Sequence, residues 1–341
     1  MFLLKVFQKK NETVPIWLMR QAGRYMPEYM AVRAGMDNFL DLCYDSDKAS
    51  KVTLQPVERF GFDAAIIFSD ILVLPHALGW DVAFKQGEGP VLRKFESEKD
   101  LSLISDNFSA KINNIYDTVS KVKGALPKNV SLIGFAGSPW TVASYMLEGK
   151  GKQDFSVSKN FLYTKRSLAE KLIGIITEKT IEYLSGQIDA GAEVIQLFDS
   201  WSGMLSGSEY HDFVIKPTKR IISALKQKYP HIPVIGFPRG AGYNYDQYIK
   251  HAGVDAVGVD QFTPLSQMKK WQEEIVVQGN LDPVILLGSK ENIARSVDEI
   301  FASMGGKGSK NFIFNLGHGI LQTTPVENVE YLVDYVKNCQ K

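Results

Sequence analysis

Seven short apolar runs recur along the chain, and stretches of helical length separate most of them. Each run is nearly continuous in apolar residues and does not alternate with polar ones, which indicates strands covered on both faces, as in a parallel sheet. The segments between them include three amphipathic stretches typical of crossover helices, at Lys159–Gly186, Ser208–Lys228 and Asn292–Met304. The pattern predicts an α/β fold. The seven runs are Asp63–Asp70, Val130–Trp140, Ala192–Trp201, Pro233–Gly240, Asp255–Phe262, Glu274–Pro283 and Asn311–His318.

The length favours one large domain. A closed barrel of eight βα units needs about 250 residues, and 341 residues accommodate it together with an N-terminal extension. No linker-like stretch and no repeat of fixed period divides the chain. We therefore expect a (β/α)8 TIM-type barrel in a single domain over residues 1–341, with an arginine-rich extension over residues 1–50 and the barrel over 51–341. The eighth strand is either Val14–Met19 or part of His76–Phe84, and an open doubly wound sheet is the alternative.

Charge and cysteine content narrow the classes of partner. There are 39 Lys and Arg residues against 38 Asp and Glu residues, a formal net charge of +1, which is unlike a general nucleic-acid or membrane-surface binder. Any anionic partner must be met by a local patch. Two distant cysteines, Cys43 and Cys339, suit a reducing compartment. With neither a membrane-spanning apolar run nor a signal-peptide pattern at the start, the sequence predicts a cytoplasmic location.

Motifs for metal, nucleotide and covalent chemistry are missing from the sequence. The histidines form no HxxxH or HxC pattern, and neither cysteine has a partner at ligand spacing, so we expect no metal. The glycine-rich Gly305–Lys310 precedes a predicted strand, where a phosphate-binding loop would follow one, and is interpreted as a surface turn. No GxSxG motif is present. The five histidines are His76, His211, His231, His251 and His318.

Polar residues end most of the predicted strands. In a parallel barrel the active site lies at the carboxyl ends of the strands, so these residues are the first candidates for chemistry. Each alone is also explained as a helix cap or turn residue, and for Asp260 that interpretation is favoured. The residues are Ser69, Asp70, Ser138, Pro139, Asp199, Ser200, Arg239, Asp260, Asn280–Asp282 and Asn315–His318.

The segment Pro15–Phe39 carries Arg20, Arg24 and Arg33 interleaved with aromatic residues, and Gly23 would permit a sharp turn. Arginine binds carboxylate and phosphate in a forked geometry and keeps its charge when desolvated. Several arginines in one loop indicate a polyanionic ligand. The alternative is a solvated helix face, because Arg20 and Arg24 stand four residues apart.

Six segments resemble the uroporphyrinogen decarboxylase family, in order along nearly the whole chain. RQAGRY and FSDIL are long and specific blocks within them. The segments are PIWLMRQAGRYMPEY at Pro15–Tyr29, LQPVERFGFDAAIIFSDIL at Leu54–Leu72, GFAGSPWTVASYMLEG at Gly134–Gly149, QLFDSWSGML at Gln196–Leu205, GNLDP at Gly279–Pro283 and FNLGHGI at Phe314–Ile320.

This resemblance implies a distorted (β/α)8 barrel, a homodimer, and an enzyme with neither metal nor organic cofactor. The implied reaction, in haem and tetrapyrrole biosynthesis, removes CO2 from the four acetate side chains of uroporphyrinogen and leaves methyl groups, giving coproporphyrinogen. The substrate carries eight carboxylates, which the arginines of the N-terminal loop would meet. Small departures from the family pattern fall at Asn38 and Gln322–Thr324.

The resemblance also implies roles for particular residues. Asp70 would accept hydrogen bonds from the pyrrole NH groups and stabilise a cation formed on ring protonation, and Tyr145 would hold both in place. Arg20 is implied as general acid, but its high pKa suits proton transfer poorly, so it either donates the proton or orients the acetate while water, a substrate carboxyl or His318 supplies it. The predicted catalytic residues are Asp70, Arg20, Tyr145 and His318, and the predicted substrate-binding residues are Arg20, Gln21, Ala22, Gly23, Arg24, Arg33, Phe39, Asp70, Tyr145, Ser200 and His318.

Two rival functions remain at this point. A zinc-dependent methyltransferase of the same superfamily would need late His and Cys ligands, and Cys339 is the only late cysteine. A non-catalytic tetrapyrrole carrier would use the arginine loop without needing Asp70. Release of CO2 distinguishes an enzyme from a carrier.

Overall fold

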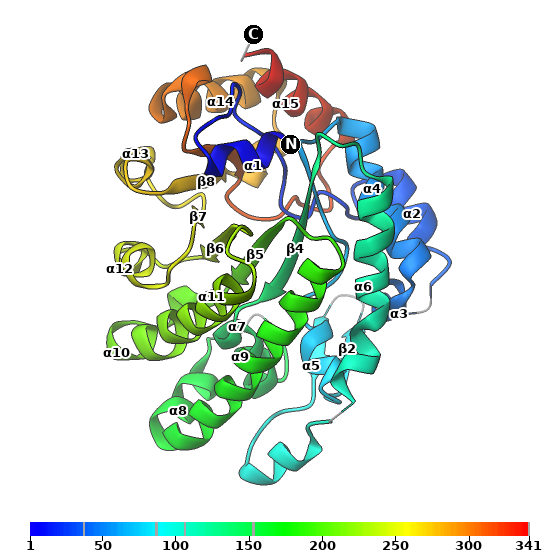
Figure 1. The fold of residues 1–341 in the computed structure, drawn as a ribbon, viewed down its shortest axis with the longest axis vertical. Coiled ribbons are helices and arrows are strands. Elements are labelled where there is room, and N and C mark those ends of the chain that lie inside the picture. The colour runs from blue at the N-terminus through cyan, green and yellow to red at the C-terminus, as the bar shows by residue number, and fades with distance from the viewer. Residues whose placement is uncertain (37, 86–87, 106, 152–153, 340–341) are drawn as a thin grey trace.

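The computed structural model describes residues 1–36, 38–85, 88–105, 107–151 and 154–339. Its centre is a parallel sheet of seven strands in the order β1-β4-β5-β6-β7-β8-β9 (Figure 1). Each predicted apolar run contains one of these strands, because each run buries its side chains on both faces of the sheet. The strands are β1 (Ala64–Ile66), β4 (Ser131–Gly137), β5 (Val194–Asp199), β6 (Val234–Pro238), β7 (Ala256–Gly258), β8 (Val276–Leu281) and β9 (Phe312–Leu316).

Residues 14–19 close the ring between β9 and β1. Ile16 forms a parallel bridge with Phe314 of β9, and its carbonyl oxygen accepts a hydrogen bond from Asp63 N (2.9 Å), just before β1. Inside the barrel, Trp17 Nε1 donates to Gln278 Oε1 of β8 at 3.0 Å. Of the two candidate eighth strands, Val14–Met19 is therefore the one in the ring. The sheet is a TIM-type barrel, and the open doubly wound alternative is wrong.

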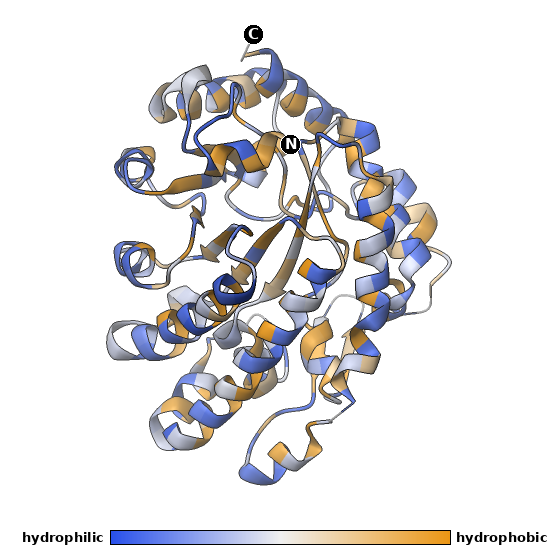
Figure 2. Cartoon of the chain, in the orientation of Figure 1, coloured by the Kyte–Doolittle hydropathy of each residue, from blue (hydrophilic) through white to orange (hydrophobic). Residues whose placement is uncertain are grey.

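Helices surround the sheet and carry mixed polar and apolar residues, while the strands are largely apolar (Figure 2). Helices such as α4, α9 and α13 pack one face on the strands, and their amphipathic pattern follows from this position. The helices are α1 (Phe2–Phe7), α2 (Pro27–Arg33), α3 (Phe39–Tyr44), α4 (Ser46–Phe60), α5 (Val73–Ala77), α6 (Phe108–Ala125), α7 (Pro139–Glu148), α8 (Ser156–Thr164), α9 (Arg166–Asp189), α10 (Gly207–Tyr210), α11 (Lys216–Lys228), α12 (Asn244–His251), α13 (Leu265–Gln272), α14 (Lys290–Met304) and α15 (Val326–Asn338).

The three predicted crossover helices are confirmed, with differences in detail. Lys159–Gly186 spans two helices, α8 and α9, separated at Lys165. Ser208–Lys228 contains a π-helical turn at His211–Ile215 between α10 and α11. Asn292–Met304 lies inside α14, and Gly305–Lys310 forms the surface connection to β9, with a short 3₁₀ turn at Gly306–Gly308.

An antiparallel hairpin of β2 (Val82–Lys85) and β3 (Gly89–Leu92) is inserted between β1 and α6, and the sequence patterns did not predict it. The second candidate eighth strand, His76–Phe84, runs from α5 into this hairpin. Leu92 N donates to Gly149 O at 2.7 Å, which fixes the hairpin beside the end of α7. Among the described residues, no helix is long and apolar enough to cross a bilayer.

Candidate active site

The arginine loop begins where the closing segment leaves the barrel. Met19 N donates to Asn315 Oδ1 of β9 at 3.0 Å, and Ile320 N donates to Met19 O at 3.0 Å. These bonds join the loop that carries Arg20 to the loop after β9 that carries His318. Residues separated by almost 300 positions in the sequence therefore lie at the same end of the barrel, beyond the carboxyl ends of the strands.

Arg20 adopts an unusual backbone conformation. Its φ is +61°, in the left-handed region that non-glycine residues seldom occupy. Gly23, expected to provide the sharp turn, is not in that region; a β-carbon there would lie 3.4 Å from Arg20 O. The turn in the loop is thus made at Arg20 itself, and such strain is often found at functional sites.

Arg20, Asp70 and Tyr145 form one electrostatic group. Arg20 is exposed as a residue, but protein atoms surround its guanidinium closely. The resulting desolvation lowers the pKa of Arg20, while the nearby Asp70 and Tyr145 raise it. Burial raises the pKa of Asp70 to about 6, against which a backbone hydrogen bond and Arg20 both act. These three predicted catalytic residues therefore lie within electrostatic reach of one another.

Asp70 follows β1 and also has a local structural role. Its Oδ1 accepts a hydrogen bond from Leu72 N at 2.8 Å, the bond expected of a turn or cap residue. A carboxylate has several further acceptor positions. Asp70 thus stabilises the turn after β1 and also lies close enough to Arg20 for their charges to interact.

Tyr145 lies on α7, which starts directly after β4. Burial, and then the charge of Asp70, raises the pKa of Tyr145 to about 12. Its ring centroid lies 6.2 Å from that of Trp201, and a β-carbon at Gly151 would lie 3.2 Å from its Cε1. The phenol is therefore packed in place and protonated at neutral pH.

His318 stands between two glycines in the loop after β9. Burial, followed by the charges of Arg239 and Arg20, lowers its pKa to about 3. His318 is therefore neutral at physiological pH in the free protein. This result also identifies Arg239, after β6, as a cation of the site that was not among the predicted site residues, although its position at a strand end had been noted.

The remaining predicted binding residues differ in exposure. Arg24 is exposed, and Arg33 donates from Nη1 to Met36 O at 2.5 Å. Phe39 is half-buried, with its ring centroid 5.9 Å from that of Phe68 and 4.7 Å from that of Phe84 in the hairpin. Ser200 is half-buried directly after β5.

Gln21 is buried, and its side-chain amide is used inside the fold. It accepts from Leu18 N (3.3 Å) and donates to Ala64 O (3.2 Å). The residue thus ties the arginine loop to β1. Ala22, next along the loop, is half-buried.

Asp260, at the same end of the barrel, uses both of its carboxylate oxygens in hydrogen bonds within the protein. Its Oδ2 accepts from Gly240 N (2.6 Å) and Tyr245 Oη (3.1 Å), and its Oδ1 accepts from Phe262 N at 3.0 Å. The turn interpretation favoured for Asp260 is confirmed.

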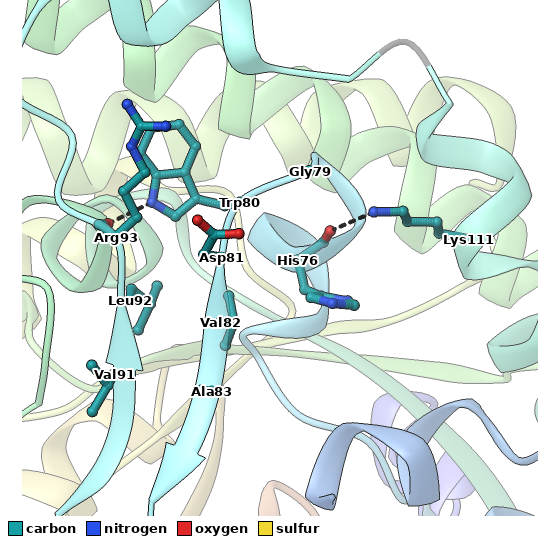
Figure 3. Close-up of a pocket in the computed structure, with 10 residues that line it drawn as sticks. All are labelled: His76, Gly79, Trp80, Asp81, Val82, Ala83, Val91, Leu92, Arg93 and Lys111. Atoms are coloured by element: carbon teal, nitrogen blue, oxygen red, sulfur yellow. Dashed lines mark hydrogen bonds between the residues drawn. The ribbon is translucent and has the colours of Figure 1, made fainter.

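A cavity of about 460 Å³ lies away from these residues, between α5, α6 and the hairpin (Figure 3). Two of its polar groups already have partners: Lys111 Nζ donates to His76 O at 3.3 Å, and Trp80 Nε1 donates to Arg93 O at 2.6 Å. None of the predicted site residues lines it. Within the described part of the chain, no group of three or more His, Cys, Asp or Glu side chains is placed to hold a metal ion.

Arg20, Asp70 and His318 lie in loops beyond the carboxyl ends of the barrel strands, and Tyr145 lies on α7 within electrostatic reach of Asp70. This is the end of the barrel at which (β/α)8 enzymes carry their active sites. The chain belongs to the uroporphyrinogen decarboxylase family, whose model, described as "Uroporphyrinogen decarboxylase (URO-D)", matches residues 2–339. Uroporphyrinogen decarboxylase of Rickettsia africae is 56% identical over 335 residues, which cover 98% of this chain and 96% of the relative. The protein of the same name from Rickettsia bellii is 57% identical over 323 residues, covering 95% and 94%.

Solved structures share the fold. A methyltransferase from Methanosarcina mazei superposes with a TM-score of 0.80 at 19% identity, covering 98% of this chain and 97% of the other. A B12-independent methionine synthase from a Shewanella species gives a TM-score of 0.56 at 10% identity, covering 87% and 86%. At these identities the likeness concerns the barrel alone.

Proposed function

We propose that this chain decarboxylates uroporphyrinogen, converting its four acetate side chains to methyl groups and yielding coproporphyrinogen in tetrapyrrole biosynthesis. The observation that carries the proposal is the match of the family model to residues 2–339. The grouping of Arg20, Asp70 and Tyr145 at one end of the barrel supports it, because these are the side chains that the reaction requires.

The charge of the substrate suits the cations of this end of the barrel. Uroporphyrinogen carries eight carboxylates. Arg20, Arg24 and Arg33 form no ion pair within 4.0 Å with any carboxylate of the described residues, whereas Arg59, Arg93, Arg166 and Arg220 do. Arginines without an ion pair inside the protein are available to bind an anionic ligand.

The reaction needs a sink for the electron pair of the breaking C–C bond. Addition of a proton to a pyrrole ring carbon makes an iminium-like cation beside the acetate. The bond to the carboxylate then breaks, CO2 leaves, and the electron pair neutralises the cation as an exocyclic methylene forms. Addition of a proton to the methylene and loss of the ring proton gives the methyl group, so each cycle consumes one proton and releases one CO2.

Asp70 is the residue placed to stabilise that cation. A buried carboxylate interacts more strongly with a developing charge than one in water. With a pKa of about 6, Asp70 is ionised at neutral pH, and it then accepts hydrogen bonds from the pyrrole NH groups. Tyr145, protonated because its pKa is about 12, keeps its hydroxyl as a donor toward substrate or Asp70.

Arg20 and His318 complete the proposed catalytic set. Arg20 holds the reacting acetate against the pyrrole ring. Neutral His318 contacts a carboxylate arm, as does Ser200, and bound carboxylates offset the two arginines that lower the pKa of His318. Arg24, Arg33 and Phe39 contact the arms and the macrocycle. Gln21, Ala22 and Gly23 shape the loop that carries the arginines.

We propose one domain over residues 1–341, a cytoplasmic location and a homodimer, for which the resemblance to the family is the main support. Exposed apolar side chains on the loops after β5 to β8 are candidates for the dimer contact: Met204, Tyr243, Phe262 and Val284, with Tyr243 100% and Phe262 71% exposed. Sedimentation of the wild type and of a Tyr243→Ser, Phe262→Ser double variant tests this. The dimer should dissociate in the variant, and a monomeric wild type would contradict the proposal.

Incubation of the purified protein with uroporphyrinogen under reducing, anaerobic conditions tests the activity. Products with seven, six, five and four carboxyls should appear with release of CO2, before and after dialysis against a strong chelator. Binding without CO2 release would indicate a tetrapyrrole carrier. Loss of turnover on chelation, with recovery on addition of zinc alone, would contradict cofactor-independent catalysis.

A further inference from the structure

We propose that Arg239 is a further substrate-binding residue, whose guanidinium binds a carboxylate arm on the wall of the site opposite Arg20. This inference rests on the function proposed above, since the anion is a carboxylate of the same substrate. It assigns a subsite to the end of β6, which the resemblance did not connect with binding.

The order of the strands places Arg239 across from Arg20. Arg20 follows the closing segment, and Arg239 follows β6. From the closing segment the ring runs through β1, β4 and β5 to β6, four positions of eight around the barrel. Half a turn separates the two arginines, so a ligand seated over the barrel axis lies between them.

The backbone at Arg239 is held by the neighbouring strand-end loops. Arg239 N donates to Asp199 O at 3.1 Å, and Arg239 O accepts from Ser202 Oγ at 3.0 Å and from Gly203 N at 3.2 Å. Gly240 N donates to Asp260 Oδ2 at 2.6 Å. The loop after β5 packs so closely on this turn that a β-carbon on Gly203 would lie 2.2 Å from Gly240 O. The side chain therefore starts from a rigid base.

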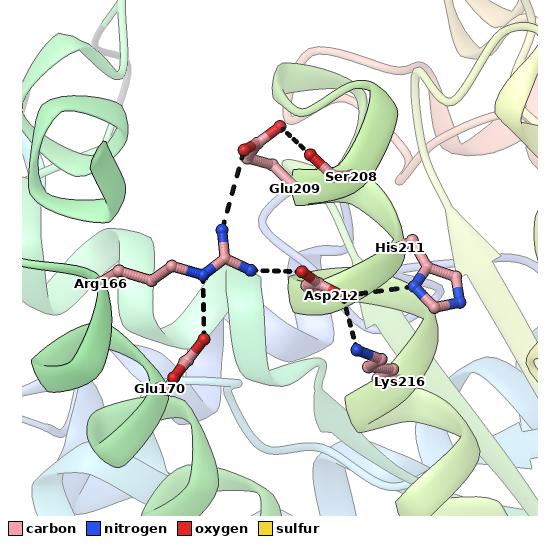
Figure 4. A network of polar contacts seen from close by, with 7 residues as sticks. All are labelled: Arg166, Glu170, Ser208, Glu209, His211, Asp212 and Lys216. Carbon is pink, nitrogen blue, oxygen red and sulfur yellow. Dashed lines mark hydrogen bonds and ion pairs between the residues drawn. The ribbon is translucent and has the colours of Figure 1, made fainter.

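The guanidinium of Arg239, by contrast, is not occupied. Its Nε is buried and has no hydrogen-bond partner, and none of the carboxylates among the described residues forms an ion pair with it. Arg166 shows the usual alternative: it lies between Glu170, Glu209 and Asp212 at the surface (Figure 4). A half-buried cation with an unsatisfied donor, on a rigid base, is suited to binding an external anion.

His318 links the two walls. Its pKa is lowered by Arg239 and by Arg20, so it lies within electrostatic reach of both. Two arginines beside a neutral imidazole create an excess of positive charge among the described groups at this point. A substrate carboxylate bound by Arg239 offsets that charge, as a carboxylate bound by Arg20 does on the opposite side of the barrel.

The variants Arg239→Gln and Arg239→Lys test the proposal, with Arg295→Gln on α14 as a control that removes the same charge from the surface. Loss of a charge-assisted hydrogen bond should raise the KM for uroporphyrinogen about 10-fold to 100-fold in Arg239→Gln, with kcat within a few-fold of wild type. Arg239→Lys should recover part of the loss, because it keeps the charge but not the fork. The control should match wild type.

A second measurement does not depend on turnover. The pKa of His318, followed by NMR, should rise in Arg239→Gln and not in Arg295→Gln, and binding of uroporphyrin, a non-reacting octacarboxylate, should weaken in the same variant. If wild type fails to decarboxylate but these shifts occur, the proposed function falls and the subsite stands. An unchanged KM together with unchanged uroporphyrin binding, in a variant with the wild-type melting temperature, would overturn the assignment of Arg239.

Discussion

Gly319 lies directly against the side chain of Arg20. A β-carbon on Gly319 would be 3.0 Å from Cβ and Cζ of Arg20 and 3.1 Å from its Nε. Gly319 is not in the left-handed region, so the backbone itself tolerates alanine. We expect Gly319→Ala to displace the guanidinium and lower kcat/KM about 10-fold or more, since small misplacements of a positioning group are costly in catalysis. Steady-state kinetics measures this.

Gly174 on α9 provides the matched control. A β-carbon there has nothing within 4 Å, and alanine inside a helix is more stable than glycine by about 0.5–1 kcal/mol. Gly174→Ala should therefore be fully active and slightly more stable. Equal activity of the two variants would show that the contact with Arg20 does not matter.

Asp70→Asn should separate activity from stability. It removes the charge that stabilises the cation, so kcat should fall by a factor on the order of 10²–10³. The fold should become more stable at pH 7–8, because burial raises the pKa of Asp70 to about 6 and the ionised form is therefore disfavoured in the folded state. The gain should be about 1–2 kcal/mol, allowing for partial access of water to the carboxylate, and thermal unfolding measures it.

Asp70→Glu distinguishes charge from placement. It keeps the charge but displaces it by one methylene, so it should retain more activity than Asp70→Asn if charge dominates and less if placement dominates. Asparagine caps turns about as well as aspartate. If Asp70→Asn turns over within a few-fold of wild type, Asp70 is not part of the mechanism. Its role is then limited to the turn hydrogen bond with Leu72 N.

The acid limb of the pH profile should report Asp70. Its pKa is raised, so the carboxylate becomes protonated as the pH falls through about 6, and kcat/KM should decline below that value as the charge is lost. The free energy of unfolding should change in the opposite direction. Because the folded state binds the proton more readily than the unfolded state, protonation of Asp70 at lower pH favours folding. A profile flat down to pH 4.5, with the protein still folded, would contradict the assignment.

Arg24→Ala should weaken substrate binding with little effect on stability. Arg24 is exposed and has no ion pair among the described residues, so its removal costs little folding free energy. Loss of one contact to a carboxylate should raise KM about 10-fold. Arg295→Ala serves as the surface control. Arg20 and Arg24 lie in turns and not on a helix, so the helix-face alternative is wrong. Early unfolding of Arg24→Ala with a normal KM would instead give Arg24 a structural role in this loop.

The seven strands were predictable because their signal is local. A strand covered on both faces must be apolar almost throughout, and polar residues must follow where it emerges. Asp70, Ser200 and the loop at His318 could be placed at one end of the barrel for the same reason, since the strands are parallel. The length of the family blocks, such as RQAGRY at Arg20–Tyr25, connected these positions with a particular chemistry.

Contacts between distant segments were decided only by the tertiary structure. The eighth strand could have been Val14–Met19 or part of His76–Phe84, because pairing with Phe314 depends on where β9 lies and not on the composition of either segment. The turn expected at Gly23 lies at Arg20, whose side chain packs against Gly319 from the far end of the chain. Arg239 is an ordinary residue in its own segment. It becomes a cation of the site because ring closure sets β6 opposite the segment of Arg20, with Arg239 within electrostatic reach of His318.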